Sequence, residues 1–335
     1  MRIDDRFKDC VAFLCTPNQF EGSGFFVRVP KSWARQEGQT YLVTARHVLF
    51  DKKGHFKRDL KLRINLTDGG TEMLPLNGGW EFSEQKPALD IPGVAGSFRH
   101  VPDAAVRPME LPQNRYAYHE LPFEGGGYVT EELIPEWGIG IGDELLIGGL
   151  FTEMHGVECN TPIVRSGIIA AMPQKEPLFD FESREWYRGY LAEMRSLGGL
   201  SGSPVLVTLD HGKDPAKVSD RITVKLLGLI RSHWDYGLER ESPRKSRARH
   251  IEKINTGIAI VTPIQEVADI LGRRDVVTKR EEAERKRLVK MHNKPTLDSA
   301  SVVPTQKTHA GATIPIRPRS QFVRDLLKAT RRREP

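Results

Sequence analysis

The sequence is poor in cysteine. Its 335 residues contain three, Cys10, Cys15 and Cys159, and these form neither a CxxC pair nor a Cys/His cluster with the spacing of a zinc site. So small and odd a number of thiols is typical of a reducing compartment. The composition therefore gives no reason to expect a disulfide-stabilised scaffold or a structural metal site.

Long hydrophobic runs are also missing. The N-terminal region contains only one short apolar run, CVAFLC at residues 10–15, which is shorter than the core of a secretory signal. No run approaches the roughly 20 apolar residues that a membrane-spanning helix needs. We therefore expect a cytoplasmic protein without a membrane span.

An excess of positive charge is missing from most of the chain. Residues 279–335 hold 15 of the 50 Lys and Arg but only 6 of the 44 Asp and Glu, so residues 1–278 hold 35 basic and 38 acidic side chains. The charge of the body thus gives no support to nucleic-acid binding. The tail predicts a charged helix followed by a partly disordered segment. It is either a docking arm for an acidic partner or a nucleic acid, or a solvated extension.

Turn residues and short apolar runs are what the sequence does contain. Thirty Gly and 22 Pro separate segments of strand length, for example 22–29, 40–49, 203–209 and 225–234. The segment PIQEVADILG at 263–272 predicts a helix, because Pro begins it, Gly ends it and its apolar residues share one face. Many short strands followed by a closing helix favour an all-β barrel fold.

A glycine-rich loop, GGLSGSP at residues 198–204, surrounds Ser201. A nucleophilic serine needs a tight turn that exposes its hydroxyl and directs backbone N–H groups at the oxyanion. Glycine before the serine allows the turn, and glycine after it leaves room for a substrate. The competing interpretation is an ordinary loop between strands.

Two further segments offer partners for such a serine. In LVTARHV, residues 42–48, an apolar strand ends in a turn that carries His47, a suitable general base. In PDAAV, residues 102–106, Asp103 opens a short apolar strand, and a buried carboxylate there fixes the tautomer of a histidine. Asp90 is the alternative, but Pro and Gly follow it, so we prefer Asp103. The competing interpretations are that His47 is an ordinary surface or core residue and that Asp103 is a turn residue.

Together these segments resemble the trypsin-like, chymotrypsin-fold serine peptidases, particularly the bacterial members without the disulfides of the animal enzymes. TARHV at 44–48 resembles the TAAHV motif of that family, GLSGSP at 199–204 its GDSGGP motif, and DAAV at 103–106 its aspartate strand. The order His, Asp, Ser is also that of the family. The resemblance extends over about residues 8–272.

The resemblance implies an all-β fold of two antiparallel six-stranded β-barrels with a C-terminal helix. The barrels would be about residues 1–125 and 126–278, which together make one peptidase domain. Residues 279–335 would follow as the basic, charged helix and partly disordered tail.

The resemblance also implies a mechanism. Ser201, His47 and Asp103 would form the catalytic triad of a serine endopeptidase that works through an acyl-enzyme. The backbone amides of Gly199 and Ser201 would form the oxyanion hole. The substrate would be a polypeptide, and neither a cofactor nor a metal is expected.

Substrate-binding residues follow by counting from Ser201. Arg195 and Ser196 would lie near the pocket for the substrate side chain before the cleaved bond, the P1 side chain. Ser232 and His233 would lie beside the bound peptide. A Ser and a His near the base of this pocket resemble the glutamate-specific members of the family, and an Arg there would also favour an acidic P1 side chain. The competing interpretation is that Arg195 is a solvated loop charge and His233 a strand-end residue.

One departure from the family pattern concerns the residue before His47. Arg46 replaces a small residue just before His47, and an arginine there is expected either to cover the histidine or to place a like charge beside it. The alternative function is therefore a catalytically inactive protein that keeps the fold as a binding or scaffold module.

Overall fold

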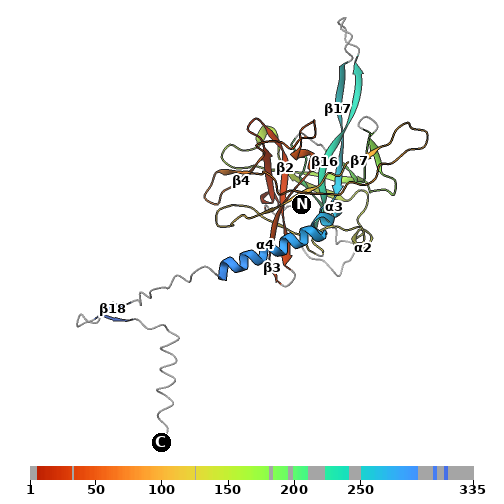
Figure 1. Cartoon of the computed structure of the whole chain (residues 1–335). Coiled ribbons are helices and arrows are strands. Elements are labelled where there is room, and N and C mark those ends of the chain that lie inside the picture. Colours follow the sequence, from red (N-terminus) through yellow and green to blue (C-terminus); the bar gives the residue numbers. More distant parts are fainter. Residues whose placement is uncertain are drawn as a thin grey trace, which may run out of the picture. The chain divides into compact units, whose positions relative to one another are not determined.

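The computed structural model describes residues 6–31, 34–124, 126–180, 184–194, 199–209, 223–240, 250–292, 305–307 and 313–315. The chain divides into two compact units, Met1–Thr278 and Lys279–Pro335. The first unit is built mainly from β-strands and contains few helices (Figure 1). All the residues that the sequence singles out for catalysis belong to this unit.

The N-terminal half of the first unit is one eight-stranded sheet. Its hydrogen-bonded order is β5-β4-β1-β2-β3-β8-β6, and β9 pairs with β2 in parallel. All five residues of β1 are buried, and Phe25 and Phe26 of β2 are fully buried, because these apolar runs line the core. The strands are β1 (Val11–Cys15), β2 (Phe20–Lys31), β3 (Ala34–Thr44), β4 (Lys61–Asn65), β5 (Thr71–Pro75), β6 (Glu81–Phe82), β8 (Ala105–Met109) and β9 (Leu121–Pro122).

The C-terminal half closes into a barrel of six antiparallel strands in the order β10-β11-β14-β17-β16-β15. Alternate residues such as Val205 and Val207 point into its core, together with Ile147 and Val261. The strands are β10 (Glu144–Gly149), β11 (Ile163–Ala171), β14 (Tyr190–Glu193), β15 (Pro204–Leu209), β16 (Thr223–Arg240) and β17 (His250–Pro263).

The prediction of an all-β, chymotrypsin-like fold is confirmed, with one difference in the strand count. The closed six-stranded barrel occurs in the C-terminal half. In the N-terminal half, β6 pairs with the free edge of β8 through Glu81–Val106 and Phe82–Ala105. β6 occupies that edge, so β5 and β8 do not pair in the described part of the sheet. Among these described residues, the hydrogen bonds of the sheet therefore do not close into a barrel.

A small third sheet joins segments from the two halves. β7 (Arg99–His100) pairs in parallel with β13 (Glu185–Tyr187), which pairs with β12 (Leu178–Asp180). β7 lies just before Asp103 in the sequence, whereas β13 belongs to the second half. This sheet therefore holds the segment that precedes Asp103 against a strand of the second half.

Strands β16 and β17 continue as a two-stranded ribbon past the barrel (Figure 1). In this ribbon, the described residues of β16 and β17 pair only with each other, from Asp235–Asn255 to Arg240–His250. The residues that pair with β14 and β15 lie closer to the barrel. Closer to the barrel, the β16–β17 register shifts between Ile230 and Ser232, which leaves Arg231 as a bulged residue.

The predicted closing helix is confirmed as α3 (Gln265–Gly272). Its Val267, Ile270 and Leu271 are buried in the core that also contains the N-terminal sheet. The other helices are α1 (Arg6–Asp9), η1 (Arg46–Leu49), α2 (Leu133–Trp137), η2 (Thr152–Met154) and α4 (Arg274–His292). Among the described helices, none combines the length and apolar character that crossing a bilayer requires.

The second unit contains most of α4, which covers the charged segment predicted as a helix. It also contains a pair of short strands, β18 (Thr305–Lys307) and β19 (Thr313–Pro315). The rest of the tail that the sequence predicts to be partly disordered lies outside the described residues.

Candidate active site

His47 follows directly on the end of β3. Thr44 closes the strand, Ala45 is extended (φ −73°, ψ 137°), and the chain then forms the short 3-10 helix η1. Val48 and Leu49 of this helix are buried and anchor it to the core, while the side chain of His47 is 47% exposed. The sequence thus builds a fixed turn that presents an imidazole at the surface.

Asp103 lies opposite this turn because β8 pairs with β3. The pair Thr44–Ala105 places the residues before β8 beside those after β3. The N–H of Arg46 donates to the backbone oxygen of Asp103 (3.2 Å), and the N–H of His47 donates to Asp103 Oδ1 (2.9 Å). His47 Nδ1 lies 3.0 Å from both carboxylate oxygens of Asp103.

This geometry assigns the tautomer of His47. An ionised carboxylate only accepts hydrogen bonds, so Nδ1 carries the proton that it shares with Asp103. Nε2 is then left as the acceptor on the exposed side of the ring. An imidazole held in this way is prepared to remove a proton from a hydroxyl.

The Asp103 carboxylate is ionised although its side chain is only 2% exposed. Burial by itself would raise the pKa of Asp103. The attraction of His47, the hydrogen bonds from His47 and the positive charge of Arg231 outweigh it, and the pKa lies below its usual value. Asp103 therefore supplies a fixed negative charge behind the imidazole.

The side chain of Arg46 packs on aromatic rings of the N-terminal half. Its guanidinium lies over the ring of Phe50, 4.5 Å from the centroid, and 5.7 Å from that of Phe82. Two aromatic faces in the same half thus hold this cation through cation–π contacts, while the side chain of His47 remains 47% exposed.

Ser201 lies in a tight turn between two glycines with left-handed backbones. Gly199 has φ +97° and Gly202 has φ +83°, a conformation that costs other residues about 1–2 kcal/mol. A Cβ at Gly202 would lie 2.2 Å from the Ser23 carbonyl oxygen and 2.4 Å from Thr44 Oγ1. The serine turn therefore packs directly on the strands β2 and β3 that lead to His47.

Ser23 of β2 fastens this turn to the N-terminal half. Its N–H donates to the carbonyl oxygen of Ser201 (2.8 Å), and its hydroxyl donates to the carbonyl oxygen of Gly199 (2.9 Å). The same hydroxyl accepts the N–H of Leu150 (2.9 Å). Ser23 is fully buried, so one side chain links three segments from the two halves.

The Ser201 hydroxyl donates to the backbone oxygen of Arg231, 3.4 Å away. Within the described part of the chain, it forms no hydrogen bond with His47. The structure thus brings the serine turn against β3, the strand that leads to His47, and pairs His47 with Asp103, while the Ser201 hydroxyl is directed to β16. The described residues also include no acceptor for the N–H of Ser201 or of Gly199.

The predicted substrate-binding residues divide into two groups. Arg195 and Ser196 lie outside the described residues. Ser232 and His233 lie on β16, half-buried, and pair with Ile260 and Ala259 of β17. They come directly after Arg231, whose carbonyl faces Ser201, so this part of β16 lies beside the serine.

Sequence reasoning missed three side chains around this site. Ser23 had one signal, its place between two glycines in GSGFFV, but nothing showed that it contacts the serine turn. Nothing in the sequence relates Arg231 or Glu185 to Asp103, because their contacts depend on a bulge and on the small third sheet.

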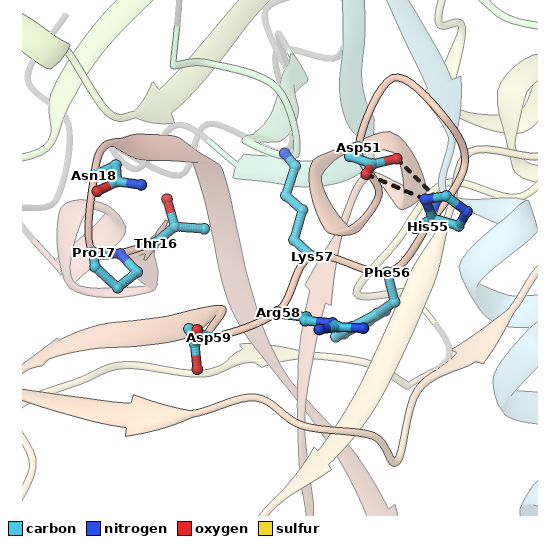
Figure 2. A pocket seen from close by; sticks show the side chains of 9 residues that line it. All are labelled: Thr16, Pro17, Asn18, Asp51, His55, Phe56, Lys57, Arg58 and Asp59. Carbon is cyan, nitrogen blue, oxygen red and sulfur yellow. Dashed lines mark hydrogen bonds and ion pairs between the residues drawn. The ribbon is translucent and has the colours of Figure 1, made fainter.

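A cavity of about 700 Å³ lies away from these residues, in the N-terminal half (Figure 2). His55 Nδ1 and Asp51 Oδ2, both of residues that line it, lie 3.6 Å apart. Side chains of both charges line the cavity together with apolar ones: Thr16, Pro17, Asn18, Asp51, His55, Phe56, Lys57, Arg58 and Asp59. Among the described residues, no group of three or more His, Cys, Asp or Glu side chains is arranged to hold a metal ion.

The fold and the site together define a chymotrypsin-like chain with an Asp–His pair beside a glycine-flanked serine. No protein-family profile matches the sequence, and no curated protein is similar to it. Three solved structures resemble its fold. Rv3671c from M. tuberculosis H37Rv, in an inactive form, is 12% identical. The alignment covers 79% of this chain and 86% of Rv3671c, with a TM-score of 0.35. Human heparin binding protein is 8% identical (80% and 92%, TM-score 0.43), and kallikrein-related peptidase 10 is 13% identical (80% and 96%, TM-score 0.36).

Proposed function

We propose that the protein is a serine endopeptidase that hydrolyses peptide bonds through Ser201, His47 and Asp103. The observation that carries this proposal is the His47–Asp103 pair, with Nδ1 3.0 Å from both carboxylate oxygens. The glycine-flanked serine turn packs on the strand that ends at this pair, as the contacts of Gly202 require. A base, its orienting carboxylate and a hydroxyl on a tight turn are the parts that acyl transfer needs.

The first step begins with a rotation of the Ser201 side chain. Its hydroxyl leaves the carbonyl oxygen of Arg231 and turns to Nε2 of His47. The oxygen then attacks the peptide carbonyl while His47 takes the proton. The backbone amides of Gly199 and Ser201 stabilise the oxyanion, a contribution of about 10²–10³ in turnover for one such donor.

The remaining steps return the enzyme to its starting state. Protonated His47 gives its proton to the leaving amine, and the acyl group stays on Ser201 as an ester. A water molecule, deprotonated by His47, then attacks this ester, and His47 returns the proton to the Ser201 oxygen as the bond to the acyl group breaks and the new carboxylic acid leaves. Asp103 stays ionised and stabilises the imidazolium that forms in each half-reaction.

We also propose where the peptide binds. An extended substrate adds to the part of β16 that carries Ser232 and His233 and takes over the carbonyl of Arg231 by backbone hydrogen bonding. Release of this carbonyl frees the Ser201 hydroxyl for His47. Arg195 and Ser196 remain the proposed residues of the P1 pocket, with an acidic side chain as the favoured occupant.

A fluorophosphonate probe tests the proposal. We expect the wild-type chain to be labelled at Ser201 and Ser201→Ala to show no labelling. Digestion of a peptide library by the same two proteins gives the cleavage products and the P1 preference. A wild-type chain that is neither labelled nor active over the whole pH range would contradict the proposal.

One observation favours a second candidate, a catalytically inactive binding module. The Ser201 hydroxyl is bonded to the Arg231 carbonyl and not to His47. In such a module an extended peptide would bind beside β16 without being cleaved. Binding of library peptides by both wild type and Ser201→Ala, with intact peptides recovered afterwards, would identify this function.

A further inference from the structure

Arg231 turns out of the regular pattern of β16. It is the bulged residue between Ile230, which pairs with Val261, and Ser232, which pairs with Ile260. A bulge changes the direction in which a strand presents a side chain. The bulge here directs the backbone oxygen of Arg231 at Ser201 and its guanidinium at Asp103.

The guanidinium of Arg231 is fixed from several sides. Nη1 donates to the carbonyl oxygen of Val101 (2.9 Å) and lies 4.0 Å from Asp103 Oδ2. Nη2 lies 3.7 Å from Glu185 Oε2, and the guanidinium carbon lies 4.5 Å from the ring centre of Tyr187. The side chain is only 11% exposed, so water screens these interactions little.

Glu185 balances the charge of this arginine. It lies on β13, is 20% exposed, and is also paired with the exposed Arg99 at 3.0 Å. Arg231 is therefore held between two carboxylates, one of the third sheet and one of the candidate triad.

Other titratable groups lie around the same pair. The carboxyl of Glu266 is buried on α3 and interacts with Asp103, Lys86 and Arg231. His100 on β7 interacts with Lys86 and Arg231. The groups that act on Asp103 and Arg231 are thus His47 from η1, Glu185 from β13, His100 from β7, Glu266 from α3 and Lys86 from the segment before β7.

We infer that Arg231 is a positioning residue that holds Asp103 and His47 in their working arrangement by a fixed, buried positive charge. The inference rests on the proposed function, because it gives a role in that reaction to a side chain outside the triad. The cation favours the ionised state of Asp103, which is the state that orients and stabilises His47. The charge of Glu185 limits the repulsion between Arg231 and the imidazolium.

The pH dependence of fluorophosphonate labelling tests this role. The acid limb of the profile reports proton uptake by the Asp103–His47 pair as a unit. Loss of the cation makes this uptake easier, so Arg231→Met should move the acid limb to higher pH by about 0.5–1.5 pH units. Glu185→Gln removes the opposing charge and should move the limb to lower pH.

Two matched variants separate charge from structure. Arg231→Lys keeps a cation and should leave the limb near its wild-type position. Arg99→Met removes the exposed arginine that pairs with the same Glu185, and it should also leave the limb in place. An unmoved limb in both Arg231→Met and Glu185→Gln would overturn the inference, even if both variants are less stable.

A second measurement does not require catalysis. In the Ser201→Ala background, the C2–H NMR signal of His47 follows proton uptake by the pair. Arg231→Met should shift the midpoint to higher pH there as well. If the wild type is not labelled, the proposed function fails, and this titration still decides the inference. A midpoint that stays in place contradicts it.

Discussion

At the scale of single residues, the serine turn depends on backbone conformations that glycine adopts without strain. Gly202 has φ +83°, and a Cβ would lie 2.2 Å from a backbone oxygen of β2. We expect Gly202→Ala to lower the free energy of unfolding by about 2–4 kcal/mol, because strain and overlap add. Urea unfolding measures this difference.

The control for this change is Gly140→Ala. An added Cβ at Gly140 would meet no heavy atom within 4 Å. We expect it to change the unfolding free energy by less than about 0.5 kcal/mol. Equal losses in Gly202→Ala and Gly140→Ala would show that the packing of the serine turn on β2 and β3 is wrong.

His100 makes the stability of the fold depend on pH. Burial, Lys86 and Arg231 lower the pKa of His100 from 6.5 to about 4, and its Nδ1 accepts the N–H of Lys86 (3.1 Å). Between these pH values the unfolded chain binds a proton that the folded chain does not. The unfolding free energy should therefore fall as pH drops from about 6.5 to about 4, by at most about 1.4 kcal/mol per pH unit from this group.

His100→Gln tests this linkage. The amide oxygen of Gln can still accept the N–H of Lys86, but the side chain does not titrate. Urea unfolding over the same pH range should show a shallower decline for the variant than for the wild type. Identical slopes would mean that His100 takes up its proton equally easily in the folded and unfolded chain.

At the scale of elements, β2 holds the serine turn through one hydroxyl. Ser23→Ala removes the acceptor of the buried Leu150 N–H and the donor to the partly buried Gly199 oxygen. We expect a loss of about 1–3 kcal/mol in unfolding free energy and slower fluorophosphonate labelling. Thr208→Ala is the matched control, because its hydroxyl bond to Glu144 is exposed. A Ser23→Ala protein as stable and as reactive as this control would contradict the role of Ser23.

Much of this element structure could be predicted from the sequence. Continuous apolar runs such as 203–209 and periodic ones such as 263–272 depend on local pattern, and both are strand or helix in the structure. The small third sheet could not be predicted. β7 has two residues, and its partner Glu185 lies far along the chain from Arg99, so no local periodicity marks the pairing.

Only those parts of the candidate site that lie in short sequence motifs could be predicted. The surroundings of His47, Asp103 and Ser201 are visible as short patterns. The direction of the Ser201 hydroxyl, the position of Arg46 on Phe50 and the approach of Arg231 to Asp103 depend on side-chain directions set by tertiary packing. Local sequence patterns do not determine these side-chain directions.

At the scale of the whole molecule, the charge is divided between the two units. Residues 1–278 carry a net charge of −3 and residues 279–335 one of +9, counted from 35 basic against 38 acidic and 15 against 6. We predict that any affinity for nucleic acid belongs to the tail. A chain ending at Thr278 should lose salt-dependent binding to a DNA duplex, measured by fluorescence anisotropy at about 50 and 200 mM salt.

The same truncated chain should keep its reaction with the fluorophosphonate, because His47, Asp103 and Ser201 all belong to the first unit. Two outcomes would contradict the prediction. One is DNA binding by the truncated chain as strong as that of the full chain. The other is a loss of labelling without a loss of folding.

The last strands of the barrel also determine when, during synthesis, the turn of Ser201 is held in its final position. The serine turn takes hydrogen bonds from β2, made early in synthesis, and from Ile230 of β16, made late. β17 then completes the ring between β14 and β16. A chain still emerging from the ribosome thus contains His47 and Asp103 long before the turn of Ser201 is held in place, so the proposed active site would be complete only once nearly the whole first unit has been made.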